Sequence, residues 1–120
     1  MANVQWTVPA VVLDVHDGDT MRVRADLGWW VQIETLVRID GINADELSTA
    51  KGKAARAFAL TLVKPGDSVT LVSKKLLGSL EKYGRVLADI ALADGRDYAQ
   101  TMLAAGQAAA WDGSGKKPTT

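Results

Sequence analysis

Two stretches of alternating apolar and polar residues most constrain what this chain can fold into. Met21, Val23 and Ala25 alternate with polar neighbours in residues 20–27, and residues 31–39 follow a similar pattern. A period of two residues indicates a half-buried strand, because successive side chains of a strand point to opposite faces of a sheet. The two stretches therefore predict strands that bury one face against a core.

The residues around these two stretches complete a β-rich pattern. Residues 6–15 are mostly β-branched and apolar and predict a first strand, which the turn-forming residues 16–19 join to the next strand as a hairpin. Residues 68–73 and 85–93 predict two more strands, and the second of them ends at Asp94-Gly95. Five strands are expected in all.

Two helices are expected between and after these strands. Ser48 or Thr49 suits the N-cap of a helix that reaches about residue 63, and residues 96–105 predict a shorter helix with Gly106 at its C-terminal end. The apolar face of the first helix is expected to comprise Ala50, Ala54, Ala57, Phe58, Thr61 and Leu62.

The order of elements predicts the fold. Five antiparallel strands with a helix between the third and the fourth are the plan of the OB-fold, a five-stranded Greek-key barrel. We therefore expect a β-rich α+β domain over residues 1–112 and a flexible polar tail over residues 113–120, with loops at residues 41–47 and 74–83. The length of 120 residues suits one domain.

Composition excludes several classes of site. The chain has no cysteine and a single histidine, so any metal site must use oxygen ligands, which suit a hard cation such as calcium. No apolar stretch approaches the ~20 residues of a membrane-spanning helix. No secretory signal is seen, so a cytoplasmic location is expected for a full chain and a secreted one if a leader was removed.

The charge balance argues against an extended grip on duplex DNA. Lysine plus arginine number 14 and aspartate plus glutamate also number 14, whereas proteins that neutralise many phosphates are usually basic. A local site that engages a few phosphates is still compatible with this balance. For the oligomeric state, we expect the chain to be a monomer.

Three polar stretches could carry chemistry. Asp17 and Asp19 flank a tight turn and could hold a divalent cation, although a plain hairpin turn is the commoner meaning of such a pair. In residues 38–46, Arg38 could bind a phosphate through its forked guanidinium and Glu46 could act as a general base on water. The alternative for that stretch is a solvated acidic loop.

The third stretch surrounds Arg85, which follows a glycine at the start of a strand. Arg85 could bind a second phosphate, and Lys74, Lys75, Lys82 and Tyr83 could make further contacts with nucleic acid. The alternative is that this stretch is a solvated charged loop. The aromatic residues Trp6, Trp29 and Trp30 could stack on bases, but packing or a hairpin tip is the commoner role. His16 is expected to be a turn residue.

Together these stretches resemble the staphylococcal nuclease family from about residue 12 to residue 106. The resemblance rests on four motifs in order: Val15-His16-Asp17-Gly18-Asp19-Thr20, residues 37–46 (Val-Arg-Ile-Asp-Gly-Ile-Asn-Ala-Asp-Glu), residues 52–58 (Gly-Lys-Ala-Ala-Arg-Ala-Phe) and residues 82–88 (Lys-Tyr-Gly-Arg-Val-Leu-Ala). A leucine and glycine near the end of the last helix, Leu103 and Gly106, complete the match.

The resemblance implies an OB-fold nuclease that cuts DNA or RNA with one calcium ion, preferring single-stranded or flexible substrates. By position, Asp19 corresponds to a metal-binding aspartate and Ala44 to a residue whose carbonyl binds the metal, with Asp17 nearby. Arg38 and Arg85 correspond to the two phosphate-binding arginines. Glu46 corresponds to the glutamate that handles the attacking water.

Two residues depart from the family pattern in the implied metal loop. Asn43 stands where the family has a second metal-binding aspartate, and Asp45 stands where a proline is usual. Asparagine still offers a carbonyl oxygen to calcium, but with one negative charge fewer. The main alternative is therefore a weak or inactive OB-fold module that binds nucleic acid or a protein partner; a structural barrel with chance matches is a third.

Overall fold

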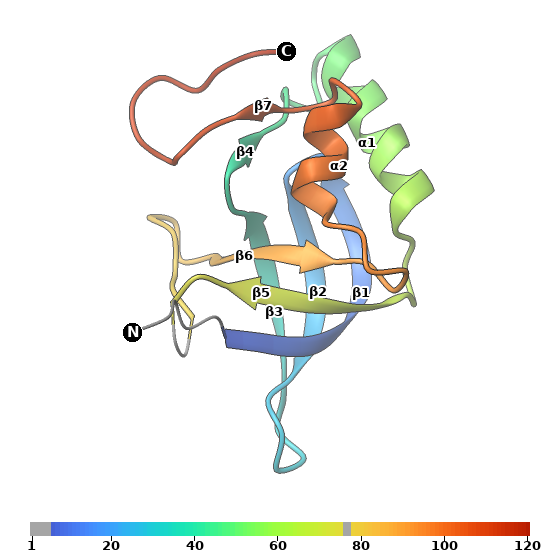
Figure 1. Ribbon diagram of the computed structural model, residues 1–120, viewed down its shortest axis with the longest axis vertical. Helices are drawn as coiled ribbons and strands as arrows, with labels where there is room; N and C mark the ends of the chain where they lie inside the picture. Colours follow the sequence, from blue (N-terminus) through green and yellow to red (C-terminus); the bar gives the residue numbers. More distant parts are fainter. Residues whose placement is uncertain (1–5, 76–77) are drawn as a thin grey trace.

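The computed structural model describes residues 6–75 and 78–120, and its main body is a closed β-barrel. The strands run around the barrel in the order β1-β2-β3-β6-β5 (Figure 1). Their bounds are Trp6–Asp17 (β1), Thr20–Asp26 (β2), Gln32–Ile39 (β3), Ser68–Ser73 (β5) and Val86–Ala91 (β6). This order, with helix α1 (Ala50–Leu62) between β3 and β5 along the chain, is that of an OB-fold. The predicted fold class is confirmed.

One pairing in the barrel differs from the antiparallel arrangement that we expected. Strand β3 pairs with β6 in parallel, whereas every other pairing in the barrel is antiparallel. Directions cannot alternate around a closed ring with an odd number of strands, so at least one pair must be parallel. The structure places that pair at Val37↔Val86 and Ile39↔Ala88, next to Arg38.

The predicted alternation is seen in the barrel core. Val12, Val15, Met21, Val23 and Val37 are all 0% exposed, and the residues between them on β2 point outward. The register pairs Thr20 with Arg38, which places these two polar residues side by side where β2 begins and β3 nears its end. The apolar pattern of the strands therefore also fixes where these polar side chains lie.

Helix α1 begins after Thr49, whose side chain accepts a hydrogen bond from Gly52 N at 2.9 Å. Its buried residues are Gly52, Ala55 and Ala59, with Val63 buried just beyond. The face that we expected is wrong, because Ala50, Ala54, Ala57 and Thr61 are exposed, and only Phe58 and Leu62 pack partly against the core. Helix α1 contacts the barrel through Gly52, Ala55 and Ala59 because these small residues let its backbone approach the strands closely.

Helix α2 (Tyr98–Ala104) and a short pair of strands lie together at one end of the barrel (Figure 1). Helix α2 is capped by Asp97, and Gly106 follows it with a φ of 71°, as expected for the glycine after a helix end. A two-residue strand, β4 (Ile42–Asn43), pairs with β7 (Ala109–Ala110), although the sequence predicted only a loop there. Two residues are too few to show a period in sequence.

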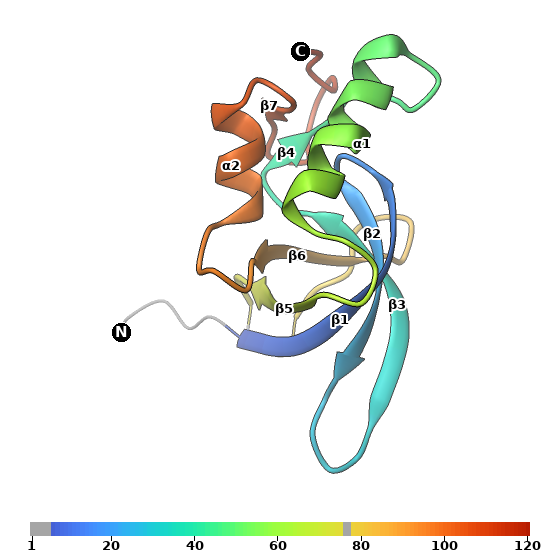
Figure 2. The same cartoon turned by 90° about the vertical axis from the view of Figure 1, so that its right-hand side faces the viewer.

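The β2–β3 hairpin extends away from the helices at the opposite end of the barrel, as Figure 2 shows. Trp29 and Trp30 lie at its tip and are 89% and 97% exposed. They therefore occupy the hairpin tip that was one of their expected positions, and they do not pack in the core. Trp6 is instead partly buried against the core. Among the described residues, no helix is both long and apolar enough to cross a bilayer.

Candidate functional site

A polar cavity of about 660 Å³ opens between the β1–β2 turn, the segment after β4, the start of α1 and the start of β6. It is lined by every residue predicted for catalysis or metal binding and by both predicted neighbours of the metal site. These residues are Asp17, Asp19, Arg38, Asn43, Ala44, Asp45, Glu46 and Arg85. The fold thus gathers into one place side chains that are spread over 69 positions of the sequence, from Asp17 to Arg85.

Asp19 forms the floor of the cavity and is only 7% exposed. Its Oδ2 accepts a hydrogen bond from Ala44 N at 2.9 Å, and its Oδ1 accepts one from Thr20 Oγ1 at 3.0 Å. Gly18 lies directly behind it, and a Cβ there would come within 2.7 Å of Ala44 Cβ. The glycine of the turn is therefore needed to bring Asp19 and the segment after β4 together.

Asp17 lines the cavity and supports the turn. Its Oδ1 accepts a hydrogen bond from Asp19 N at 3.0 Å. Burial, together with repulsion from Asp19, raises the pKa of Asp17 from 3.8 to about 6. Ionisation of Asp17 is therefore disfavoured at this position.

Arg38 is a buried cation with a fixed orientation and is 6% exposed. Its Nη1 donates to Ile39 O at 2.8 Å and to Ile42 O at 2.9 Å. Its Nη2 donates to Asn43 Oδ1 at 3.2 Å and lies 3.5 Å from Asp19 Oδ2. The guanidinium carbon also lies 5.6 Å from the centre of the Trp111 ring, a cation–π distance. The charge is therefore held in place before any ligand arrives.

Asp45 and Glu46 follow β4 and lead into helix α1. Glu46 is exposed in the cavity, and its backbone oxygen accepts hydrogen bonds from Thr49 N at 2.9 Å and Thr49 Oγ1 at 2.7 Å. A Cβ at Gly52 would lie 1.8 Å from the same oxygen. The helix cap and a glycine on α1 therefore fix the position from which the Glu46 side chain extends.

Arg85 enters the cavity from the segment before β6. Its Nε and Nη2 donate to the two carboxylate oxygens of Glu81 at 3.0 and 3.1 Å, and its Nη1 points to Thr20 Oγ1 at 3.4 Å. These hydrogen bonds lower the pKa of Glu81 from 4.5 to about 2 and raise that of Arg85. Glu81 holds the forked guanidinium with its remaining end turned toward the cavity.

The residues predicted for nucleic-acid contacts divide into two groups. Lys82 and Tyr83 line a second hollow that adjoins Arg38, Arg85 and Trp111, and Lys82 Nζ lies 5.0 Å from the centre of the Tyr83 ring. Lys74 instead pairs with Asp40 at 3.5 Å, and Lys75 is exposed; neither lines either hollow. The structure therefore brings only Lys82 and Tyr83 next to the predicted site.

The C-terminal segment also lines the cavity, through residues 117–120. Asn43 Nδ2 donates to Pro118 O at 3.0 Å, and Asp45 accepts from Thr120 N at 3.3 Å and from Thr120 Oγ1 at 2.6 Å. Lys51 Nζ donates to Thr120 O. The division at residue 112 stays a prediction, but the segment beyond it lies against the two residues that depart from the family pattern.

The oxygen atoms around Asp19 are of the type that a hard cation such as calcium binds. The side chains of Asp19 and Asn43 and the carbonyl of Ala44 offer only oxygen, which calcium prefers. No cluster of three or more His, Cys, Asp or Glu residues poised for a metal occurs over residues 6–75 and 78–120. Oxygens of Asp19 and Asn43 already contact Arg38, so a cation would have to share them with the guanidinium.

Several residues of the site were not predicted from the sequence. Glu81 lies just before the motif of residues 82–88, and the motif did not indicate that Glu81 pairs with Arg85. Likewise, nothing in the sequence indicated that Thr20, Trp111 and Lys51 belong to the site. The contacts of Thr20 with Arg85 and of Trp111 with Arg38 join segments far apart in the chain, which no local pattern records. The four-residue spacing of Glu81 and Arg85 was the one usable signal.

Comparison with known proteins adds one match to this geometry. Residues 36–119 match the family model described as "Staphylococcal nuclease homologue", which is more than half of the chain. The match includes Arg38, Glu46 and Arg85 and begins after Asp19. A search of curated proteins found no match.

Proposed function

The chain belongs to the family of staphylococcal nuclease homologues, and we propose that it hydrolyses phosphodiester bonds of single-stranded or flexible DNA or RNA with calcium as its cofactor. The observation that carries this proposal is the convergence of two guanidinium groups and the Glu46 carboxylate on one polar cavity beside Asp19. A phosphodiester is anionic and gains charge in the transition state, so fixed cations around it are the largest usual catalytic contribution.

The two arginines have complementary roles in this proposal. Arg38 is buried and already oriented by backbone carbonyls, so little reorganisation is needed when phosphate binds. Arg85 is only partly buried, and Glu81 holds one side of its fork while Nη1 is directed to Thr20. A forked guanidinium matches two phosphate oxygens at once, which a lysine ammonium does not.

Glu46 is the residue that accepts a proton from the attacking water. Its carboxylate is exposed within the cavity, while its backbone is fixed by Thr49. General-base assistance by a positioned carboxylate typically contributes about 10²–10⁴-fold to the rate. Calcium held by Asp19, Asn43 and the Ala44 carbonyl would supply further charge stabilisation and polarise the phosphate.

A combined substitution and cofactor experiment tests this function. The purified chain is incubated with denatured DNA and with RNA, in calcium and then in chelator. Glu46→Gln is expected to reduce cutting by at least about 100-fold, whereas the control Glu34→Gln, on the outer face of β3, is expected to cut at the wild-type rate. Equal rates for Glu46→Gln and wild type would exclude Glu46 as the general base. Cutting that continues in chelator would exclude calcium as the cofactor.

A second function is favoured by the contacts of Asn43. Because its amide binds both Arg38 and the C-terminal segment, the cavity could serve a non-catalytic module that binds nucleic acid or a protein partner. Such a module would bind a labelled oligonucleotide without shortening it, and Glu46→Gln would leave that binding unchanged. Calcium-dependent loss of the substrate would exclude this function.

A further inference from the structure

The tip of the β2–β3 hairpin is apolar and exposed over five consecutive residues. Hairpin tip here means residues 27–31, in which Leu27 and Val31 are 39% and 49% exposed and flank Trp29 and Trp30, which are 89% and 97% exposed. Large apolar side chains gathered on a protruding loop mark an interaction site more often than scattered ones do. Nothing in the catalytic proposal uses this tip.

The backbone of the tip is also unusual for its sequence. Val31 N donates to Gly28 O at 2.8 Å, and the two central residues, Trp29 and Trp30, have φ values of 54° and 60°. Such turns need positive φ at both central positions and strongly favour Asn-Gly. Bulky aromatic residues are poor choices there, and no packing against residues 6–75 or 78–120 compensates for them, which points to a role outside the chain.

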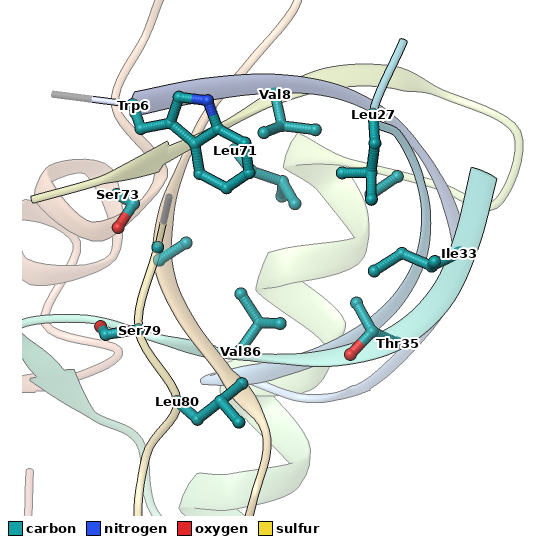
Figure 3. Close-up of a pocket in the computed structure, with 13 residues that line it drawn as sticks. Trp6, Val8, Leu27, Ile33, Thr35, Leu71, Ser73, Ser79, Leu80 and Val86 are labelled. Carbon is teal, nitrogen blue, oxygen red and sulfur yellow. The ribbon is translucent and has the colours of Figure 1, made fainter. Parts of the chain in front are cut away.

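An apolar opening lies at the same end of the barrel. This barrel mouth is a cavity of about 290 Å³, and the side chains that define it are Trp6, Val8, Leu27, Ile33, Leu80 and Val86. Figure 3 shows Leu27 and Ile33 of the hairpin on one side of the opening and Trp6 on the other. A dry apolar cavity of about 150 Å³ accepts benzene, so this opening is large enough for an indole ring.

We propose that two copies of the chain form a symmetric dimer in which the hairpin tip of each copy docks in the barrel mouth of the other. The tip and the mouth share Leu27 and adjoin on one face. A twofold axis beside that face therefore lets both contacts form at once, as an isologous interface requires. The tip does not fill the mouth of its own chain, because both tryptophans are almost fully exposed.

The area available suits a stable dimer. A buried tryptophan covers about 150–250 Å². With one indole inside the mouth and the second against its exposed rim at Leu80, one tip and the mouth that receives it would bury roughly 600–1,000 Å² together. Two such contacts give roughly 1,200–2,000 Å², the size of a standard protein interface.

Charge favours a second copy over a polyanion. The formal net charge of the chain is zero, so two copies do not repel each other. Residues 22–34, the part of the hairpin nearest the tip, carry Arg22 and Arg24 but also Asp26 and Glu34, which leaves no net positive charge there to attract nucleic acid or anionic lipid. The aliphatic Leu27 and Val31 also suit an apolar protein surface better than base stacking.

The test measures molecular mass by light scattering and sedimentation over a range of concentrations. Wild type is expected to show a monomer–dimer equilibrium. Trp29→Asn with Trp30→Gly removes the apolar tip but installs the pair that the turn prefers, so folding is retained. We expect this double variant to raise the dimer dissociation constant at least about tenfold, whereas Tyr83→Ala, which removes an exposed aromatic elsewhere, is expected to leave it unchanged.

A mixing experiment tests the geometry itself. Leu80→Glu places a charge at the mouth and leaves the tip intact, so this variant, like the tip variant, is expected to dimerise at least about tenfold more weakly than wild type. Mixed together, the two variants can form one of the two contacts, because the intact tip of one can enter the intact mouth of the other. The mixed dimer should therefore be tighter than a dimer of either variant alone, although weaker than that of wild type. A monomeric wild type, or a dimer unaffected by the tip variant, overturns the proposal. The proposal is also overturned if the chain stays monomeric and its hairpin tip binds phosphatidylcholine vesicles or a single-stranded oligonucleotide. Those ligands would then be the partners of the tip.

Discussion

Asn43 links three parts of the cavity through one side chain. Its amide oxygen accepts from Arg38, and its amide nitrogen donates to Pro118 O. A carboxylate at this position could still accept from Arg38 but could not donate to Pro118. The identity of this one residue therefore influences both the charge around a bound cation and the position of the C-terminal segment.

We predict that Asn43→Asp binds calcium about tenfold more tightly than wild type. A carboxylate ~4 Å from a divalent ion has a gross attraction of several kcal/mol at an effective dielectric of ~20. Repulsion from Asp19 and desolvation offset much of it, which leaves about 1–2 kcal/mol. Calorimetric titration measures the affinity, and activity is followed in parallel.

An unchanged calcium midpoint would show that position 43 does not face the ion or that Asp45 already supplies the charge. Asp45→Ala in the same background distinguishes these two explanations. If Asp45 supplies the charge, the double variant binds calcium more weakly than Asn43→Asp alone.

At the scale of elements, helix α1 positions the segment that carries Glu46. The contact depends on Gly52, where a Cβ would lie 1.8 Å from Glu46 O and 2.8 Å from Asp45 O. Both neighbours are backbone atoms, so no side-chain rotation relieves the overlap. The helix and the segment that carries Glu46 must then separate if position 52 carries a side chain.

We predict that Gly52→Ala destabilises the fold by about 1–3 kcal/mol, the usual range for overpacking. Alanine favours a helix over glycine by about 1 kcal/mol, but a backbone overlap outweighs that gain. Cutting should fall as well, because Glu46 is displaced. Thermal unfolding measures the first effect, with Lys53→Ala on the exposed face of α1 as the control; a variant at least as stable as wild type would contradict the prediction.

Helix α2 is attached to β6 through an acidic pair. Asp89 Oδ1 accepts from Ile90 N at 2.7 Å and from Ala99 N at 3.2 Å, and the N-cap Asp97 faces it. Burial and the contact with Asp97 raise the pKa of Asp89 from 3.8 to about 7. The folded chain therefore binds more protons than the unfolded chain between these two values, and stability falls as pH rises through that window.

We predict that Asp89→Asn removes this pH dependence and stabilises the chain at pH above 7. Asparagine can keep the acceptor oxygen for Ala99 N without carrying a charge. Because Asp89 is only partly buried, solvent screening reduces the gain to about 1 kcal/mol. Denaturant unfolding of both proteins across this pH range measures it, and parallel pH profiles would contradict the assignment to Asp89.

At the scale of the whole molecule, the two features of interest lie at opposite ends of the barrel. The polar cavity lies where the C-terminal segment and the two helices gather, and the hairpin tip extends from the other end (Figure 1, Figure 2). Association through the tip would therefore leave both cavities of a dimer accessible. The C-terminal segment lines the cavity through residues 117–120 and therefore affects access to it.

We predict that removing residues 117–120 lowers the KM for an oligonucleotide by roughly tenfold. The segment makes hydrogen bonds to Asn43 and Asp45 that a substrate entering the cavity must displace. Each bond contributes about 0.5–1.5 kcal/mol, partly offset by the entropy of ordering the segment. Steady-state kinetics of the shortened and full chains measure the effect; an unchanged KM would show that the segment does not compete with substrate.

The sequence by itself determined the barrel and the composition of the site. Alternation in β2 was visible because one face of that strand is buried, and the turn residues around Gly18 follow from local backbone geometry. Strand β3 was predicted by the same period, but it is exposed at Gln32–Glu34 and buried on both faces at Val37–Ile39. The motif residues Asp19, Arg38, Glu46 and Arg85 were identified by type and spacing, and all line the cavity.

Only the tertiary structure decided how these parts meet. The parallel β3–β6 pair follows from closing an odd ring, and the buried face of α1 follows from how closely small residues let it approach the barrel. The contacts of residues 117–120 with Asn43 and Asp45 and the exposure of the hairpin tip depend on which surfaces the folded chain leaves open. Local sequence patterns record period and turn chemistry, whereas these contacts arise when distant segments pack.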